Sequence, residues 1–336
     1  MTASHDGAVM SARHAIPVTE IRGFYLDGPS GPGGARRAQR PRVPAAAARD
    51  DALAARDDAL AARAYVQAVR LAAPRAATPV ALLPGGGGLT GACYESGLDG
   101  SPGWQLGLLR SGYDTFVVDW NASGRTPWPR DTSPGSARIR LRSPAGPWEL
   151  FRLGPPGSYS PGPARRTSYP GSRFPGELFE VFLSQVRPTF PGYTRYQPAA
   201  FDALLSGLGP LAMVSFSAAG PLAAAASLRQ PAKVCAHVLV EPSGGPDPAA
   251  ADLRPLAHVP HLFLWGDYLG SPAGNWRELH LSARRYAAGL RAVGADVTWI
   301  DLPSRGIAGN THLLMFDDNA PELLETIAAW LGSHLT

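Results

Sequence analysis

The chain has 336 residues, of which 45% are hydrophobic, so it can bury the core of one large α/β domain or of two small ones. Its net charge is +4, and nearly all of its positive charge comes from arginine, since Lys233 is the single lysine. The arginines are scattered among Pro, Ala and Gly, with only short clusters at 35–42 and 137–142. This pattern is not typical of a phosphate-binding stripe and argues against a nucleic-acid partner.

The two cysteines and the N-terminal segment indicate the cellular compartment. Cys93 and Cys235 lie in apolar segments without a metal-ligand spacing, so we expect two reduced thiols, with one disulfide as the alternative. The first residues contain no apolar segment typical of a signal peptide, and no run of about eighteen apolar residues follows. We therefore expect a soluble, cytoplasmic protein without a membrane span.

The N-terminal part of the chain contains a tail and an insertion. Residues 1–17 are expected to be a disordered tail, and one domain is expected over 18–336, beginning with a strand over 18–28. The heptad DDALAAR occurs twice in succession, at 50–63, and its composition favours a helix. Two copies cannot bury a core, so we interpret 45–63 as a helical insertion without a catalytic role.

From residue 64 onward, predicted strands alternate with predicted helices. A Pro-, Gly- and Arg-rich stretch, 121–175, shows no period and, with the helix after it, forms an insertion over about 121–190 that is expected to cover the site. The alternation predicts an open, mostly parallel sheet with helices on both faces, where ligands bind outside the carboxyl ends of the strands. The predicted strands are 64–72, 78–84, 113–120, 210–216, 233–241, 259–267 and 295–303, and the predicted helices are 103–112, 176–187, 198–208, 217–228, 276–293 and 319–335.

The segment AMVSFSAAG (212–220) has the pattern of a strand, a turn and a helix. It approximates the G-x-S-x-G nucleophile turn around Ser217, with Ser215 and Ala219 at the glycine positions. A hydroxyl placed at the sharp turn would be exposed at the carboxyl edge of the sheet. The alternative is an ordinary serine that caps a helix.

A glycine-rich loop, PGGGGLTG (84–91), follows an early core strand. Acyl transfer needs two backbone N–H groups directed at the developing oxyanion, one from the residue after the nucleophile and one from such a loop. Ala218 and either Gly86 or Gly87 are therefore the candidate donors. A phosphate-binding loop and a flexible turn are alternatives, but the phosphate-binding motifs are absent.

A serine nucleophile needs a base, and the base needs a group that orients it. Of eight histidines, only His312 lies in a loop after the last predicted strand, as the chain order Ser, acid, His requires. Glu241 and Asp267 each end a predicted strand, and the spacing does not separate these two candidate acids.

Four segments of the chain form a recognisable set of motifs: PGGGGLTG, FRLGPPG (151–157), VEPSGGP (240–246) and, most specifically, GIAGNTHLLMFDDN (306–319). Together they resemble the Alcaligenes-type bacterial esterases of the α/β-hydrolase superfamily, from about residue 18 to the C-terminus. The matching family patterns are H-G-G-G-x-T-G, the covering segment, E-P-x-G-P and G-I-x-G-N-T-H-x-x-M-x-D-x-N. The similarity implies the α/β-hydrolase fold, with the cover segment inserted before the nucleophile strand.

The resemblance also implies roles for individual residues. It implies a triad of Ser217, Glu241 and His312, with oxyanion donors at Gly86 and Ala218. Asp267 then becomes a supporting residue or alternative acid, as does Glu95, and Asp99 and Trp104 also match family positions near the site. The chain departs from the family at Phe216 (His is usual), Ala219 (Gly or Ser) and Gly85 (His).

The function implied is hydrolysis of a small-molecule carboxylic ester through an acyl-enzyme, without a metal or an organic cofactor. A homodimer is the candidate assembly. The alternatives are a non-catalytic binding protein with the same fold, or an acyltransferase that uses the same serine. The substrate pocket is expected to be lined by aromatic residues, with ordinary packing as the alternative for each: Phe216, Trp128, Trp148, Phe151, Tyr159 and Phe174.

Overall fold

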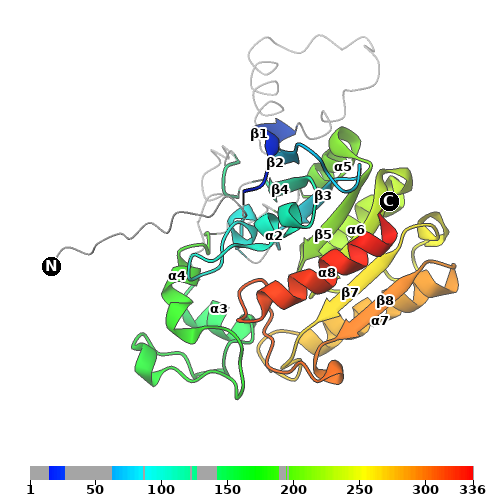
Figure 1. Cartoon of the computed structure of the whole chain (residues 1–336). Helices are drawn as coiled ribbons and strands as arrows, with labels where there is room; N and C mark the ends of the chain where they lie inside the picture. Colours follow the sequence, from blue (N-terminus) through cyan, green and yellow to red (C-terminus); the bar gives the residue numbers. More distant parts are fainter. Residues whose placement is uncertain are drawn as a thin grey trace, which may run out of the picture.

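The computed structural model describes residues 15–26, 63–85, 88–121, 123–126, 142–188, 194 and 197–335 (Figure 1). The predicted tail, apart from 15–17, and the predicted helical insertion, apart from Arg63, lie outside the described residues. Gly86, Gly87 and Trp128 lie outside them too.

The core of the fold is an eight-stranded sheet with the order β1-β2-β4-β3-β5-β6-β7-β8. Among the strands of this sheet, only β1 with β2 and β2 with β4 pair antiparallel, and β3 to β8 run parallel, which confirms the predicted mostly parallel sheet. The strands are β1 (Val18–Leu26), β2 (Ala64–Leu71), β3 (Val80–Leu83), β4 (Thr115–Asp119), β5 (Leu211–Phe216), β6 (Val234–Val240), β7 (His261–Trp265) and β8 (Val297–Asp301).

Helices cover both faces of the sheet (Figure 1). All six residues of β5 are buried, because alternate side chains enter the two cores on either side of the strand. The helices α2 (Trp104–Arg110) and α8 (Ala320–His334) contribute to one core. The helices α5 (Gln197–Leu208), α6 (Ala219–Arg229) and α7 (Trp276–Ala292) contribute to the other. No helix in the described ranges is long and apolar enough to cross a bilayer.

Short 3-10 helices occupy several of the connections. They are η2 (Gly91–Tyr94), η3 (Pro163–Arg165), η4 (Gly176–Leu178), η6 (Pro231–Lys233), η7 (Arg254–Leu256) and η8 (Pro303–Arg305).

The predicted insertion, 121–190, lies between β4 and α5, and we call it the inserted segment. Its described residues, 121, 123–126 and 142–188, contain more regular structure than the sequence predicted. It forms α3 (Ala145–Leu150) and α4 (Phe179–Leu183), and the predicted helix over 176–187 is divided between η4 and α4. Helices of one or two turns carry too few residues to show a hydrophobic period.

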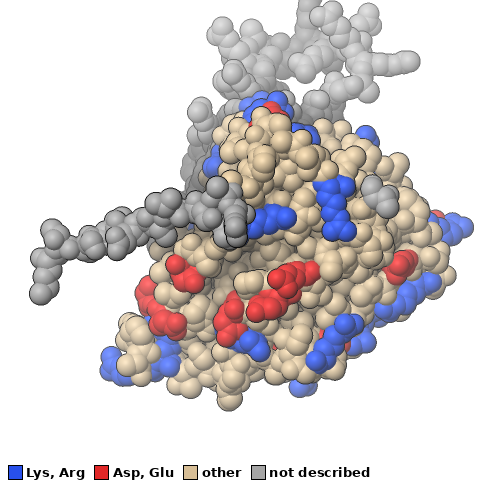
Figure 2. Space-filling model, viewed as in Figure 1, with Lys and Arg blue, Asp and Glu red and all other residues tan. Residues whose placement is uncertain are grey.

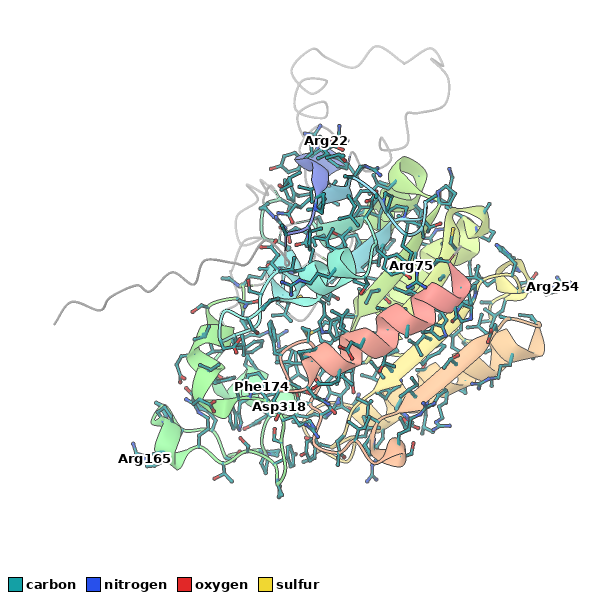
Figure 3. The ribbon with its side chains drawn as sticks, in the orientation of Figure 1. Arg22, Arg75, Arg165, Phe174, Arg254 and Asp318 are labelled. Carbon is teal, nitrogen blue, oxygen red and sulfur yellow. The ribbon has the colours of Figure 1, made fainter. Side chains whose placement is uncertain are left out.

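The inserted segment packs at one end of the sheet, apart from the helices on the two faces (Figure 1). It contacts the loop after β8: the N–H of Arg173 donates to the carbonyl of Gly309 (2.8 Å), and the N–H of Asp318 donates to the carbonyl of Arg173 (2.9 Å). Figure 3 shows Phe174 and Asp318 close together at this junction, whereas Arg22, Arg165 and Arg254 lie at separate ends of the molecule. The distant positions of these arginines agree with the scattered charge of the sequence.

Candidate active site

Three side chains form one hydrogen-bonded chain at the carboxyl ends of the parallel strands. Ser217 follows β5, Glu241 follows β6, and His312 lies in the loop after β8. Ser217 Oγ lies 2.9 Å from His312 Nε2, and His312 Nδ1 lies 3.1 Å from Glu241 Oε2. Glu241 and His312 have no exposed surface, and Ser217 is 6% exposed. The structure therefore brings together the three residues that the sequence singled out, although they are far apart along the chain.

Ser217 occupies a sharp turn between β5 and α6. Its φ of +54° lies in the left-handed region, which is strained for a residue with a side chain. The turn is held by hydrogen bonds from the N–H of Ser217 to the carbonyl of Val240 and from the N–H of Gly220 to the carbonyl of Ser217, each 3.0 Å long. The hydroxyl faces His312 and, at 3.5 Å, Ser243 Oγ, and α6 begins without a side-chain cap. The alternative of a helix-capping serine is therefore wrong.

Glu241 is held by groups on both carboxylate oxygens. Its Oε2 faces His312, and its Oε1 accepts hydrogen bonds from Arg152 Nη2 (2.8 Å) and from the N–H of Gly266. Burial acts to raise the pKa of Glu241, but the guanidinium of Arg152 and the hydrogen bond with His312 outweigh burial, and the pKa lies below its ordinary value. Glu241 is therefore ionised at neutral pH.

The imidazole of His312 is enclosed by aromatic rings. The ring centroids of Trp276, Phe216 and Phe151 lie 4.2, 4.7 and 5.6 Å from that of His312. Burial lowers the pKa of His312 to about 4, although Glu241 opposes the shift. His312 is therefore uncharged at neutral pH, and Nε2 can accept a proton from Ser217 while Nδ1–H donates to Glu241.

The loop that carries His312 is organised by a second buried carboxylate. Asp317 accepts hydrogen bonds from Thr311 N (2.8 Å), Thr311 Oγ1 (2.7 Å) and Asn310 Nδ2 (2.9 Å). Burial raises the pKa of Asp317 to about 7, against the effect of these hydrogen bonds. Asp317 belongs to the G-N-T-H motif, so its proximity to His312 was visible in the sequence, but its contacts were not.

The two other carboxylates that the sequence offered, Asp267 and Glu95, interact with groups other than His312. The carboxylate of Asp267 accepts the N–H groups of Tyr268 (2.7 Å) and Gly309 (3.2 Å). Glu95 pairs with Arg125 at 3.3 Å. Neither pairs with His312, whose Nδ1 faces Glu241.

A cavity of about 220 Å³ opens beside the serine. Of the predicted pocket residues, Phe151 lines it, and Phe216 is buried against His312. Trp148 and Phe174 are not at this cavity, because both pack against Phe179 in an aromatic cluster. The described lining consists of Leu150, Phe151, Ser217, Ala218, Ser243, Gly274, Asn275, Trp276, Leu279 and His312.

Comparison with known proteins finds similar solved structures and a curated relative. A bacterial esterase of known structure superposes with a TM-score of 0.77 and 23% identity, over 96% of this chain and 98% of that one. The chain has the α/β-hydrolase fold. A curated fungal protein (Fungal sp.), named as a probable secreted lipase, phiG, is 24% identical over 304 residues, 73% of this chain and 79% of the relative. No family model matches the chain.

In this α/β-hydrolase fold, four residues around Ser217, Glu241 and His312 were not predicted from the sequence. Ser243 and Trp276 line the cavity, Arg152 binds Glu241, and Asp317 orders the histidine loop. Arg152 lies in FRLGPPG and Ser243 in VEPSGGP, so both were inside quoted motifs without an assigned role. Trp276 is the first residue of α7, and no motif in the sequence indicated that it lies near the site.

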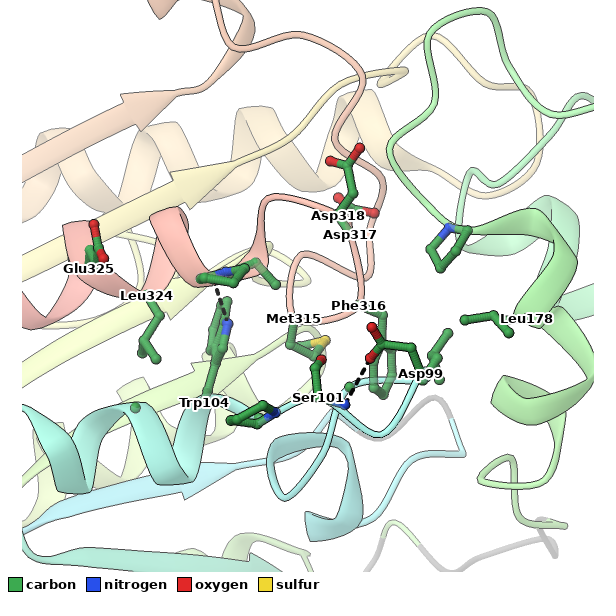
Figure 4. Close-up of a pocket in the computed structure, with 18 of the residues that line it drawn as sticks. Asp99, Ser101, Trp104, Leu178, Met315, Phe316, Asp317, Asp318, Leu324 and Glu325 are labelled. Atoms are coloured by element: carbon green, nitrogen blue, oxygen red, sulfur yellow. Dashed lines mark hydrogen bonds between the residues drawn. The ribbon is translucent and has the colours of Figure 1, made fainter. Parts of the chain in front are cut away.

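A larger cavity, of about 790 Å³, has none of Ser217, Glu241 and His312 in its lining. Figure 4 shows residues that border it. The cavity is bordered by the loop 97–103, by α2, by the first turns of α8 and by residues 175–178. Asp99 and Trp104 line it, so these family positions lie at this cavity rather than beside Ser217. Four further carboxylates line it, those of Glu177, Asp317, Asp318 and Glu325. Figure 2 shows acidic side chains gathered on the face viewed there.

Proposed function

We propose that the protein is a serine esterase that hydrolyses a carboxylic ester of a small molecule. The observation that carries this proposal is the buried hydrogen-bonded chain from Ser217 through His312 to Glu241, which begins at a strained strand-to-helix turn. The likeness to a bacterial esterase and to a fungal lipase gives independent support.

The proposed reaction has two steps, and His312 transfers the proton in both. Ser217 Oγ attacks the ester carbonyl carbon while His312 Nε2 accepts the hydroxyl proton, and ionised Glu241 stabilises the imidazolium. The tetrahedral intermediate collapses as His312 returns the proton to the leaving alcohol. Water then attacks the acyl-enzyme, with His312 accepting its proton, and the acid and the free serine are released.

The proposed oxyanion donors are the N–H of Ala218 and that of Gly86 or Gly87. Ala218 lies directly after Ser217, at the start of α6, and lines the same cavity. In enzymes of this kind, one such donor contributes on the order of 10²–10³ in rate.

The cavity supports a small apolar group on the ester. Its volume of about 220 Å³ is small, and Leu150, Phe151 and Leu279 contribute apolar lining. Because drug-sized ligands occupy roughly 300–1,000 Å³, we propose a short acyl or alcohol part. Two of these residues come from the inserted segment, which we propose acts as a cover over the site.

The test is intact mass after exposure to a fluorophosphonate, with the wild type beside Ser217→Ala. We expect one adduct on the wild type and none on the variant, since only an activated serine displaces the fluoride. Ser243→Ala is the matched control, because its hydroxyl lies in the same cavity, and it should still accept one adduct. A folded wild type without an adduct would contradict the esterase function and favour a binding protein.

A further inference from the structure

Three consecutive residues of the inserted segment reach the triad and its surroundings. The carbonyl of Leu150 accepts a hydrogen bond from Trp276 Nε1 (3.0 Å), and the carbonyl of Phe151 accepts one from the N–H of His312 (3.1 Å). Arg152 then donates from Nη2 to Glu241 Oε1 at 2.8 Å. A single short stretch of chain, between β4 and β5, therefore contacts both the base and the acid.

Arg152 is an unusual residue in several respects. Its side chain has no exposed surface, and its φ of +60° lies in the left-handed region. Its Nε donates to the carbonyl of Asp267 (2.8 Å), and its guanidinium lies 4.6 Å from the centre of the Trp276 ring. A buried cation is costly unless it is paired, and its ion pair is with Glu241. A strained backbone with a buried charge persists only where the surroundings hold it.

We propose that Arg152 is a positioning residue that fixes the orientation and the charge of Glu241, so that the triad is complete only when the inserted segment is docked. This inference rests on the proposed function, because it assigns Glu241 the role of the catalytic acid.

The orientation argument follows from the two carboxylate oxygens. Arg152 and the N–H of Gly266 occupy Oε1, which leaves Oε2 directed at His312 Nδ1. Without Arg152 the carboxylate can rotate, and its hydrogen bond to the imidazole loses its fixed direction.

The charge argument concerns all the ionisable groups that face this pair. Glu241 and His312 lie after different strands, Asp317 lies in the same loop as His312, and the Asp267 carboxylate is turned toward the N–H groups of Tyr268 and Gly309. The cation of Arg152 lowers the pKa of Glu241 and also disfavours a second positive charge on His312. Burial is the main cause of the low pKa of His312 and Arg152 adds to it, so we expect the loss of this guanidinium to raise the pKa of His312.

The experiment compares Arg152→Met and Arg152→Lys with the matched control Arg166→Met. Arg166 is a second, nearly buried arginine of the inserted segment, paired with Glu180 and lying over the rings of Trp148 and Phe179, with no contact to the triad. Thermal unfolding first identifies the variants that fold.

The readout is the pH dependence of the rate at which a fluorophosphonate modifies Ser217. We expect Arg152→Met to move the acid limb of this profile upward by about one pH unit, the usual effect of losing an adjacent charge, and to lower the plateau rate. Arg166→Met should leave the limb unchanged. Equal profiles for the two methionine variants, or an unmoved limb in folded Arg152→Met, would overturn the proposal.

Arg152→Lys provides the decisive result if Arg152→Met does not fold. Lysine keeps the charge but lacks the planar fork that holds Glu241 and the carbonyl of Asp267 together. We expect an acid limb near that of the wild type and a plateau rate at least about tenfold lower, because positioning is lost while charge is kept. A wild-type plateau in Arg152→Lys would contradict the positioning role.

A second readout does not depend on activity. The pKa of the His312 imidazole can be followed by NMR in histidine-labelled protein, with the resonance assigned by its loss in His312→Gln. A higher pKa in Arg152→Met than in the wild type supports the coupling even if no adduct forms, and an unchanged pKa refutes it even in an active enzyme. Failure of the inference is thereby separated from failure of the proposed function.

Discussion

Phe216 and Gly85 occupy two positions where the esterase motifs usually have histidine, and the structure relates the two departures. A Cβ added to Gly85 would lie 3.0 Å from Phe216 Cδ1 and 2.8 Å from the Cβ of Ser217. The ring of Phe216 also packs against His312. A large residue before Ser217 is therefore matched by the smallest possible residue in the glycine loop, and neither change displaces Ser217 from His312.

The choice between Glu241 and Asp267 as the acid is testable at the residue scale. Glu241→Gln keeps the shape of the side chain but removes the charge that stabilises the imidazolium, so we expect kcat to fall by about 10²–10⁴. Asp267→Asn changes a carboxylate that binds only backbone N–H groups among its described contacts, and we expect less than a tenfold loss. Steady-state hydrolysis of a short-chain ester measures both. A larger loss in Asp267→Asn would reverse the assignment.

Buried histidines are expected to make the protein sensitive to acid. His261 has no exposed surface, its Nδ1–H donates to the carbonyl of Val259, and burial lowers its pKa to about 4. Above the unfolded pKa of about 6.5 neither state is protonated. Between that pH and about 4 only the unfolded chain binds the proton at this histidine. The free energy of unfolding therefore decreases as the pH is lowered, by about 3 kcal/mol in total.

The measurement is urea unfolding at several pH values between 7.5 and 4.5. His261→Leu should lose less stability over this range than the wild type, because one group no longer contributes to the slope. His237, whose pKa burial also lowers, gives an effect of the same sign in both proteins. The exposed His258 is the control, and His258→Leu should follow the wild-type curve. A His261→Leu slope equal to that of the wild type would contradict this account.

At the scale of elements, we expect the conformation of the loop after β8 to depend on Asp317 and not on the neighbouring Asp318. Asp317→Ala leaves three buried donors on Thr311 and Asn310 without their acceptor. At about 1–3 kcal/mol for each unsatisfied group, we expect a loss of at least about 3 kcal/mol in unfolding free energy, and a lower kcat because His312 is displaced. Chemical denaturation and ester hydrolysis measure the two effects.

Asp318 is the matched control for this prediction. It is the next residue in the sequence but is largely exposed, and its carboxylate pairs with Arg173. Asp318→Ala should cost less than about 1 kcal/mol, the usual value for a surface ion pair. Equal losses in the two variants would show that the loop is not organised through Asp317.

The same scale shows what the sequence could predict. The parallel strands were visible because both of their faces are buried, which gives continuous apolar segments such as VALL and HLFLW. The loop of His312 was visible because its polar residues are close together in the sequence. The contact between Arg152 and Glu241 was not, because it joins residues 89 positions apart and no local pattern records such a pairing. Trp148 and Phe174 were misplaced for a related reason, since composition shows that an aromatic residue is buried but not which neighbours bury it.

At the scale of the whole molecule, the two thiols report on global unfolding. Both cysteines are free, as predicted; Cys93 is buried in the core and Cys235 is half-buried. Burial and the nearby carboxylates of Asp119 and Glu95 raise the pKa of Cys93 well above its ordinary value. We expect a thiol reagent to titrate at most one cysteine in the native protein and two in denaturant, and a reductant to leave Tm unchanged. Rapid reaction of both thiols in the native state would show that the core around Cys93 opens locally.

The contacts of residues 150–152 also limit how the proposed esterase can be redesigned. A designer who wished to alter its selectivity would naturally replace the segment between β4 and β5, because that segment lines the pocket. The same graft would remove the cation beside Glu241 and the carbonyl that holds the backbone of His312. The residues that line the pocket and those that hold Glu241 and His312 therefore belong to the same short segment. A donor segment will serve only if it brings an arginine to the position of Arg152 with the same left-handed backbone.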